Sequence, residues 1–596
     1  MFNPQTANRL KAFREELASR GLKGFVVPLT DEHASEYVAD YAQRIAWLSG
    51  FLGSAGQVVV LDNAAAVFVD GRYTIQIAAQ VDPKLYEHRH LIDEPPVDWI
   101  AERAGPGDVI GYDPFLHTIG WVENTRATLA RKGAKLQPVD SNPVDAVWQD
   151  QPGEPNTAVL PHDVKFAGQT SEEKRQEIAA ALAKQGADAC VVTALDSIAW
   201  LFNIRSDDVL HTPVSLAYGT VASDGTATLY MDLVKMSEQL QVHLGNRVEV
   251  RAKSEFLDGL SELGAAGKNV LVDPATASAA IFDRLEQSGA KISKGMDVCA
   301  LPKARKNKTE QQGARDAHVR DGAAIARFLH WLSIEAPKGG QDELSAAAKL
   351  RAFRDETGVL KDLSFRTISA AGSNGALCHY SVSEETNLPI KMNSIYLVDS
   401  GGQYDDGTTD ITRTIAVGTP TAEQKDRFTR VLKGHIALAT AIFPKGTTGP
   451  ALDAFARLPL WQAGLDYDHG TGHGVGSFLA VHEGPGRIAK VQNTVALEPG
   501  MIFSDEPGYY KAGEYGIRIE NLVLVQELDV GGEQKMLGFE TLTLAPIDVN
   551  LVDTSIMTAD EIDWFNAYHA RVMKEIGPRV DDATRAWMAK VTAPIN

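Results

Sequence analysis

The order of apolar and polar positions along the chain repeats itself. Residues 9–27 (RLKAFREELASRGLKGFVV) place apolar side chains at helical spacing, then a glycine turn, then a short apolar strand, and residues 174–192 (KRQEIAAALAKQGADACVV) have the same order. Further on, the sequence IAWL at 45–48 recurs at 198–201. Agreement in order and in local sequence predicts that an α/β domain of about 150 residues is duplicated.

Both copies alternate helical periodicity with short β-branched strands, such as QVVVL at 57–61 and ATLY at 227–230. A proline-rich stretch at 151–161 separates the two copies, and a second joint near 300–307 separates the second copy from the rest of the chain. We therefore predict two α/β domains and, after them, a larger third domain. The expected domains are 1–155, 156–308 and 309–596.

Helix start signals place three helices in the third domain. Each signal is a threonine with glutamine or glutamate three residues later, the spacing of a capping box. The first of these helices is expected to end before Pro337, and the last belongs to a helical tail at the end of the chain. The pairs are Thr309 with Gln312, Thr421 with Gln424, and Thr558 with Glu561.

Two pairs of strand-like segments in the third domain contain acidic residues within apolar runs. Segments 394–404 and 410–418 are joined by Asp-Asp-Gly, a hairpin signal, and segments 501–510 and 515–525 are joined by a short turn. A carboxylate embedded in a strand costs free energy unless it is paired, hydrogen-bonded or bound to a cation. Four such carboxylates predict a metal site; they are Asp399, Asp410, Glu506 and Glu520.

Histidines and glycines are concentrated between these strand pairs, in HGTGHGVGSFLAVHEGPG at 469–486. Glycine at this density lets the backbone approach a bound ion or substrate closely. His469, His473 and His482 in this segment are therefore candidate site residues, and His379 in GSNGALCHY is a further candidate.

Four carboxylates and one imidazole make an oxygen-rich ligand set that suits Mn, Co, Fe or Zn rather than the thiolate sites of structural zinc. Two ions about 3.5–4 Å apart can hold a bridging hydroxide and polarise a carbonyl oxygen. The ligand set therefore predicts metal-dependent hydrolysis.

Arg518 lies two residues before Glu520, which would place both side chains on one face of a strand.

Charge and composition restrict the other classes of function. The 596-residue chain has 58 basic and 78 acidic side chains, a net charge of −20, so binding to nucleic acid would need a basic patch that we do not find in the sequence. The densest basic run, KARKNK at 303–308, is interpreted as a solvated linker.

Three scattered cysteines exclude a disulfide framework. We find no signal peptide and no run of about 18 apolar residues, which favours a cytoplasmic enzyme without membrane spans.

These motifs together resemble those of the Xaa-Pro aminopeptidase P family, three-domain metallopeptidases with a pita-bread catalytic fold. The resemblance implies two creatinase-N-like (RNase H-like) α/β domains ahead of a pita-bread catalytic domain with a helical tail. It covers nearly the whole chain. The motifs are Asp-x-Gly and then Asp-x-Thr-Arg in the first strand pair, HGTGHGVGSF-x-x-VHEGP, SDEPGYY and GIRIEN, with DEHASEY, SGFLGSAG, DGRY and IAWLFNIR in the N-terminal domains.

By this resemblance the third domain would bind two divalent ions, most commonly Mn²⁺, with Zn²⁺ or Co²⁺ as alternatives. Asp410 and Glu520 would bridge the ions, and Glu506 would also act as the general base. The full set of implied metal ligands is Asp399, Asp410, His473, Glu506 and Glu520.

Four further residues match positions of the family's active site. His482 and His379 match positions that bind the peptide and stabilise the oxyanion. His469 and Arg518 match supporting positions, and Arg518 would orient metal ligands.

The activity implied by the resemblance is release of the N-terminal residue from short peptides with proline in second position, by attack of a bridging hydroxide on the Xaa-Pro carbonyl. Prolidase, which cleaves Xaa-Pro dipeptides with the same five ligands, is the main alternative, although its arrangement usually has one N-terminal domain. A non-catalytic pita-bread binding protein is a second alternative, and retention of all five ligand positions argues against it. A homodimer formed through the catalytic domain is also implied.

Overall fold

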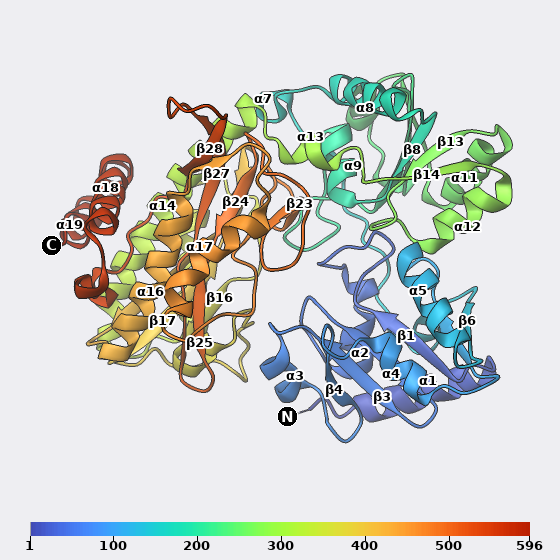
Figure 1. The fold of residues 1–596 in the computed structure, drawn as a ribbon, viewed down its shortest axis with the longest axis horizontal. Coiled ribbons are helices and arrows are strands. Elements are labelled where there is room, and N and C mark those ends of the chain that lie inside the picture. Colours follow the sequence, from blue (N-terminus) through green and yellow to red (C-terminus); the bar gives the residue numbers. More distant parts are fainter. Residues whose placement is uncertain (1) are drawn as a thin grey trace. The chain divides into compact units, whose positions relative to one another are not determined.

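The computed structural model describes residues 2–596, which form two compact units. The first unit consists of Met1–His162 and Gln169–Ala300, and the second of Asp163–Gly168 and Leu301–Asn596. Each unit has its own sheets (Figure 1). Each also has its own hydrophobic clusters. Within residues 2–596, every helix is too short or too polar to cross a lipid bilayer.

Two six-stranded sheets of the same topology form the first unit. In each sheet, the first strand in sequence order pairs antiparallel with the second strand of that sheet. It also pairs parallel with a strand from later in the chain. The duplication predicted from the repeat is therefore confirmed at the level of topology. In spatial order the strands are β4 (Glu87–His90), β3 (Ala65–Val69), β2 (Gln57–Leu61), β1 (Gly24–Pro28), β5 (Val109–Tyr112) and β6 (Lys135–Pro138), and β12 (Val248–Ala252), β11 (Ala227–Met231), β10 (Ala217–Ala222), β8 (Ala189–Val192), β13 (Asn269–Val272) and β14 (Lys291–Lys294).

The two copies contact each other at equivalent positions. Thr118 precedes the helix after β5, and Ser278 precedes the helix after β13, and these two residues form an isolated antiparallel bridge. Next to it, the Ala279 N–H donates to the His117 carbonyl at 2.8 Å. The longer helices of this unit are α1 (Thr6–Ser19), α4 (Pro96–Arg103), α5 (Ile119–Ala130), α8 (Ser171–Gln185), α9 (Leu195–Phe202), α11 (Phe256–Ala265) and α12 (Ala279–Ser288).

The second unit contains one six-stranded sheet and several smaller sheets. One three-stranded sheet is β16 (Ile368–Ala371), β17 (Ser394–Ser400) and β20 (Ile411–Val417), and another is β15 (Asp362–Leu363), β18 (Gly402–Tyr404) and β19 (Gly407–Thr408). A hairpin is formed by β25 (Gly508–Lys511) and β26 (Tyr515–Arg518). In spatial order the six-stranded sheet is β21 (Phe443–Pro444), β28 (Met536–Thr541), β27 (Asn521–Leu528), β24 (Ile502–Asp505), β22 (Gly472–Gly474) and β23 (Glu483–Ile488).

Helices cover both faces of β17. Ile395 belongs to a buried cluster with residues of α16 (Ala422–Ala439), whereas Tyr396 and Val398 belong to a cluster with residues of α14 (Lys308–Glu335). Alternation along a strand produces this division, because successive side chains point to opposite faces. Figure 1 shows α16 and α17 (Gly449–Trp461) in front of the strands and α14 behind them. The remaining long helices are α15 (Glu343–Asp355), α18 (Ala559–Ile576) and α19 (Asp582–Val591).

Two of the three predicted capping boxes are confirmed, at Thr421 for α16 and Thr558 for α18. The prediction for α14 is wrong by two residues. Asn307 is the N-cap, and its side chain accepts hydrogen bonds from the backbone N–H groups of Thr309 and Glu310 at 2.9 and 3.1 Å. Asn307 and Glu310 themselves have the spacing of a capping box, so the local start signal lies two residues earlier than the one predicted. Asn307 also donates to the Ala167 carbonyl at 2.7 Å.

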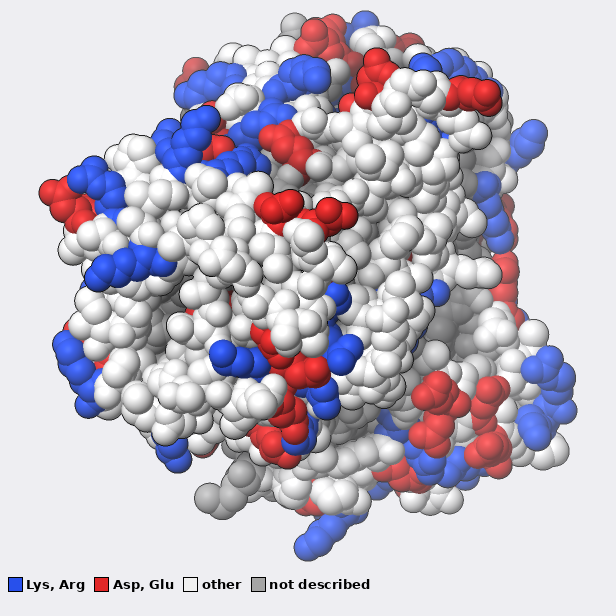
Figure 2. All heavy atoms as spheres, turned by 60° about the vertical axis from the view of Figure 1, so that its left-hand side comes forward, with Lys and Arg blue, Asp and Glu red and all other residues white. Residues whose placement is uncertain are grey.

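Charged side chains on the face drawn in Figure 2 lie in small groups of both signs, separated by broad uncharged areas. Many of these charges are paired in the structure; Arg315 and Arg320 of α14, for example, each contact two carboxylate oxygens, of Glu540 and Asp406 respectively. Local pairing of this kind limits the field that the net charge of −20 produces at any one place.

Candidate active site

The four carboxylates singled out in the sequence lie on or directly beside the strands of the second unit. Asp399 is within β17 and faces Thr412 of β20 across the antiparallel ladder, and Asp410 directly precedes β20. The expectation that Glu506 and Glu520 are embedded in strands is wrong, because each lies at a break between two strands. Outside the regular ladder, their backbone N–H groups donate to the carbonyls of Thr471 and Thr412, at 2.8 and 3.2 Å.

His473 completes this group from β22, at a point where the pairing register with β23 shifts. One ligand atom from each of Asp410, His473 and Glu520 lies within 4.8 Å of the others. The Nε2 atom of His473 is 3.5 Å from Asp410 Oδ2 and 3.5 Å from Glu506 Oε1. The structure therefore brings the imidazole and three of the carboxylates together.

Hydrogen bonding outside the group sets the chemistry of His473. Its Nδ1 atom is 2.9 Å from the Gly474 carbonyl, which can only accept, so Nδ1 carries a proton. In the neutral ring Nε2 is then an acceptor that faces two carboxylate oxygens. Oδ1 of Asp399 and Oδ1 of Asp410 are buried without a hydrogen-bond partner in the part of the chain that the structure describes. A cation between these acceptors would satisfy them, so the donor set fits divalent metal ions.

Burial also shapes the acid–base behaviour of the carboxylates. Burial raises the pKa of Asp410 well above its usual range, and the charges of Asp399 and Glu506 raise it further. Burial and the neighbouring Asp410 likewise raise the pKa of Glu520. Burial raises the pKa of Glu506, although the charges of His473 and Arg518 oppose this change. Bound cations would reverse this repulsion and keep the carboxylates ionised.

Arg518, the last residue of β26, orients two of the carboxylates. Its guanidinium donates to Asp399 Oδ2 at 2.6 Å and, through Nε, to the Thr412 hydroxyl at 3.1 Å. Thr412 in turn donates to Glu520 Oε2 at 2.8 Å. The arginine predicted to share a face with Glu520 therefore reaches it through a threonine.

Tyr510 connects Arg518 to His469. The arginine donates to the Tyr510 hydroxyl oxygen at 2.5 Å, and this hydroxyl lies 2.8 Å from His469 Nε2. His469 Nδ1 is 2.7 Å from the Gly470 carbonyl, so Nε2 accepts the tyrosine proton. Burial raises the pKa of Tyr510, which keeps that proton in place.

His482 lies directly against the candidate ligands. Its ring meets the His473 ring edge to face, with the centroids 4.3 Å apart.

His379 comes after a short 3-10 helix, η5 (Gly372–Ala376), that packs on β26. The contact is between backbones, because a Cβ added at Gly516 would lie 1.7 Å from the Gly375 carbonyl oxygen. Gly516 pairs with Tyr510 across the β25–β26 hairpin. The segment that carries His379 is therefore next to the Arg518–Tyr510 network.

Two residues of the site were not identified from the sequence as functional residues. Tyr510 ends the motif SDEPGYY, and Ser504 opens it. The Ser504 hydroxyl donates to Glu506 Oε1 at 3.1 Å and accepts from the His473 N–H at 2.9 Å. Their position within a motif that contains a candidate ligand was the available signal.

The interpretation of KARKNK as a solvated linker is wrong for two of its lysines. Lys303 and Lys306 are buried, and both amines contact the Glu483 carboxylate, that of Lys303 at 3.1 Å. Glu483 is itself 3% exposed and is the residue after His482. A buried acceptor distant in sequence determines the placement of these lysines, so the local composition did not reveal it.

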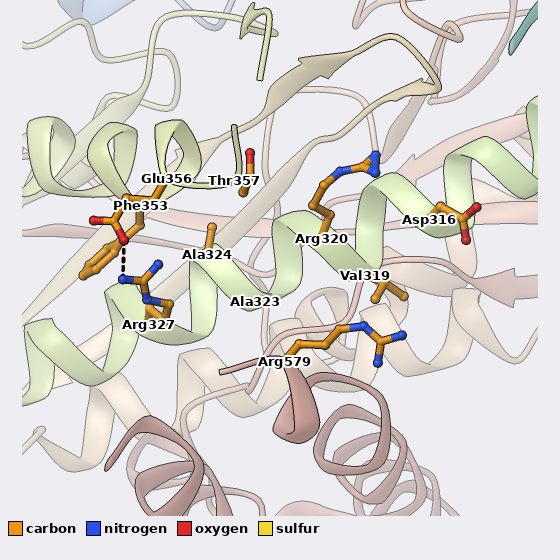
Figure 3. Close-up of a pocket in the computed structure, with 10 residues that line it drawn as sticks. All are labelled: Asp316, Val319, Arg320, Ala323, Ala324, Arg327, Phe353, Glu356, Thr357 and Arg579. Carbon is orange, nitrogen blue, oxygen red and sulfur yellow. Dashed lines mark hydrogen bonds and ion pairs between the residues drawn. The ribbon is translucent and has the colours of Figure 1, made fainter. Parts of the chain in front are cut away.

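A separate cavity of about 470 Å³ lies along α14, lined partly by Arg320, Arg327 and Arg579 (Figure 3). In Figure 3 Arg327 is directed at Glu356, while Arg320 and Arg579 point in different directions. Arg320 is paired with Asp406, and Arg579 donates to the Glu575 carbonyl at 2.6 Å. These arginines are engaged by the protein itself, and the cavity contains none of the candidate metal ligands.

Comparison with family models divides the chain into four matches. Residues 9–147 and 150–310 each match the creatinase/prolidase N-terminal domain. Residues 312–527 match metallopeptidase family M24, and residues 535–595 match the C-terminal region of that peptidase family.

Two relatives match over nearly the full length, and a prolidase matches over part of the chain. A probable Xaa-Pro aminopeptidase P of Laccaria bicolor is 41% identical over 606 residues, covering 99% of this chain and 94% of its own. The crystal structure of an X-prolyl aminopeptidase from Caenorhabditis elegans, described as a cytosolic enzyme with a di-nuclear active site, is 36% identical, with a TM-score of 0.95 and full coverage of both chains. The prolidase of Pyrococcus horikoshii has the same fold over 63% of this chain and 99% of its own, with a TM-score of 0.50 and 24% identity.

Proposed function

The chain belongs to metallopeptidase family M24, with creatinase-type domains ahead of the peptidase domain, and from this premise we propose that it is an Xaa-Pro aminopeptidase. It would release the N-terminal residue from peptides that have proline in second position. The observation that carries the proposal is the convergence of His473 Nε2 with the oxygens of Asp410, Glu506 and Glu520. Full-length relatives named for this activity support it.

The residues proposed to hold two divalent ions are Asp399, Asp410, His473, Glu506 and Glu520, and we favour Mn²⁺. When bound, the ions would lower the pKa of a water molecule and polarise the scissile carbonyl. Partnerless buried oxygens on Asp399 and Asp410, within the described residues, support this assignment.

Glu506 would transfer the proton during hydrolysis. Its carboxylate would accept a proton from the attacking water and return it to the prolyl nitrogen as the C–N bond breaks. The Ser504 hydroxyl, 3.1 Å from Oε1, would hold the carboxylate in orientation. Burial raises the pKa of Glu506, which favours acceptance of the proton by this carboxylate during the exchange.

His482 and His379 would bind the peptide and stabilise the negative charge that develops on the carbonyl oxygen. Arg518 would fix Asp399 directly and Glu520 through Thr412. His469 would support Arg518 through Tyr510.

Hydrolysis of three peptides by the metal-loaded protein tests the proposal. We expect release of arginine from Arg-Pro-Pro and little from Arg-Ala-Ala. Turnover of the dipeptide Arg-Pro alone would favour a prolidase instead. No turnover of any peptide by protein with full metal content would favour a non-catalytic binding protein.

Four finer points belong to the same proposal. The domains would be 1–155, 156–308 and 309–596, the location cytoplasmic, the assembly a homodimer and the native metal manganese. The description of the Caenorhabditis elegans relative as cytosolic supports the location. Elemental analysis of protein purified without added metal, together with its mass in solution, would test the metal and the assembly.

A further inference from the structure

Glu343, the first residue of α15, is a completely buried carboxylate that has no role in the proposed mechanism. Its Oε1 accepts from the Ala371 N–H at 2.7 Å and from the Asn374 amide at 3.0 Å. Its Oε2 accepts from the Tyr380 hydroxyl at 2.8 Å and from the Leu388 N–H at 2.9 Å. All these donors are neutral, and the N-terminus of α15 adds a favourable dipole.

The donors lie on both sides of His379 in the sequence. Ala371 and Asn374 precede it, and Tyr380 and Leu388 come after it. The segment between them contains η5 but forms no strand. One carboxylate therefore ties together the two ends of the loop that carries His379.

A second contact fixes the same loop against the active site. Gly375 of η5 lies against Gly516 of β26, too close for a Cβ at either position. Arg518 is two residues beyond Gly516 on that strand. The loop is thus held on one side by β26 and on the other by Glu343.

We propose that Glu343 is a positioning residue that holds His379 in place for catalysis. The inference rests on the proposed function, since it assigns Glu343 a role through a peptide-binding histidine. A carboxylate is required because both of its oxygens accept. In Glu343→Gln the amide NH₂ would have to face the N–H of either Ala371 or Leu388, so one end of the loop would lose its anchor.

A double-mutant cycle between Glu343→Gln and His379→Ala tests the proposal, with kcat and KM for Arg-Pro-Pro measured separately. We expect Glu343→Gln alone to lower kcat/KM by about 10- to 100-fold, since small displacements of a catalytic group have effects of this size. In the His379→Ala background the same substitution should change kcat/KM by less than about 2-fold. Both single variants should keep the full metal content.

His482→Ala supplies the matched control, because His482 lies on a different segment, next to β23. Glu343→Gln should reduce kcat/KM in this background by the same factor as in the wild type. An undiminished effect of Glu343→Gln in the His379→Ala background would overturn the proposal. Equal coupling of Glu343 to both histidines would also overturn the proposal, because it would indicate general damage to the site.

If Glu343→Gln fails to fold, Tyr380→Phe provides the same test with one donor removed. We expect it to lower kcat/KM about 3-fold alone, as for the loss of one modest hydrogen bond, and to have no effect beside His379→Ala. Additive losses would again overturn the proposal. The proposed function fails separately, since an inactive wild-type protein would show no turnover before any substitution is made.

Discussion

The inward-facing atoms of Asp399, Asp410 and His473 are hydrogen-bond acceptors. Gly474 fixes the tautomer of His473, and Arg518 occupies one oxygen of Asp399 and leaves the other buried with no partner among the described residues. Burial raises the pKa of Asp410 and Glu520, and repulsion from the neighbouring carboxylates raises it further. The surrounding contacts therefore build a site whose stable form contains cations.

Asp410→Ala should remove metal binding and activity together. Asp410 contributes to the cluster with His473 and Glu520, so its loss takes away a direct ligand. Substitution of residues that merely support a ligand costs about 10- to 100-fold, and we expect a larger loss of kcat/KM here. Elemental analysis should show reduced metal content. Asp406→Ala, in the turn of the same hairpin, is the control and should keep both its metal and its activity. Full activity of Asp410→Ala in the presence of a chelator would contradict the assignment of Asp410 as a metal ligand.

Tyr510→Phe should lower activity without loss of metal. The hydroxyl joins Arg518 to His469, and its removal leaves a buried guanidinium N–H and a buried imidazole nitrogen without this partner. We expect kcat/KM to fall about 10-fold, the lower end of the range for supporting residues. Tyr509→Phe, one residue earlier on β25, is the control and should be close to wild type. Equal effects at the two tyrosines would show that the network is not specific.

At the scale of elements, the sequence predicted the strand pairs but not the points at which the strands are interrupted. Apolar runs and the Asp-Asp-Gly turn predicted the β17–β20 pairing, and ligand candidates within them were inferred from the cost of burying a charge. The positions of Glu506 and Glu520 between strands depend on tertiary hydrogen bonds to Thr471 and Thr412. No local pattern encodes such bonds.

The same limit explains the residues that sequence reasoning missed. Lys303 and Lys306 have the composition of a linker, and only Glu483, 177 residues beyond Lys306, makes their burial favourable. Glu343 looks like an ordinary first-turn acid of a helix, and its donors come from a loop later in the chain. Contacts between distant segments decide these cases, whereas capping and hairpin signals are local.

Glu483→Ala should destabilise the second unit. The substitution leaves the amines of Lys303 and Lys306 buried without their carboxylate. Breaking a buried ion pair from one side costs about 3–5 kcal/mol, and we expect a loss of this size in the free energy of unfolding. Urea denaturation measures it. Glu335→Ala breaks the surface pair with Lys338 in the same unit and is the control, which should change stability by less than about 0.5 kcal/mol. Similar values for both variants would contradict the structural role of Glu483.

His569 of α18 should make the second unit sensitive to acid. Its Nε2 accepts from the Ile547 N–H at 3.0 Å, and burial, with the charge of Arg413, lowers the pKa of His569 from 6.5 to about 3. Between these values the unfolded chain binds a proton that the folded chain does not, so stability falls as the pH decreases. From pH 7 to pH 5 the loss from this residue is about 2 kcal/mol.

His569→Gln provides the measurement, because the glutamine oxygen can still accept from Ile547. The free energy of unfolding of this variant should fall less steeply between pH 7 and pH 5 than that of the wild type. Parallel pH profiles would show that His569 does not titrate on unfolding.

At the scale of the whole molecule, the chain separates support from chemistry. The first unit has two copies of one sheet topology, and its buried clusters include residues from both copies. The second unit has its own clusters around α14 and α16 and contains all five proposed metal ligands. Two units with separate cores are expected to unfold as separate cooperative transitions.

Calorimetry with and without metal tests this division. Excess Mn²⁺ should raise the melting temperature of only one of two transitions, because a ligand stabilises the unit that binds it. At 100 times its dissociation constant a metal ion contributes about 2.7 kcal/mol. Each kcal/mol corresponds to a shift of about 2 °C in a unit of this size. Asp410→Ala should abolish the shift and leave the other transition unchanged. A single transition that moves as a whole would mean that the two units unfold together, and the division drawn from their separate cores would be wrong.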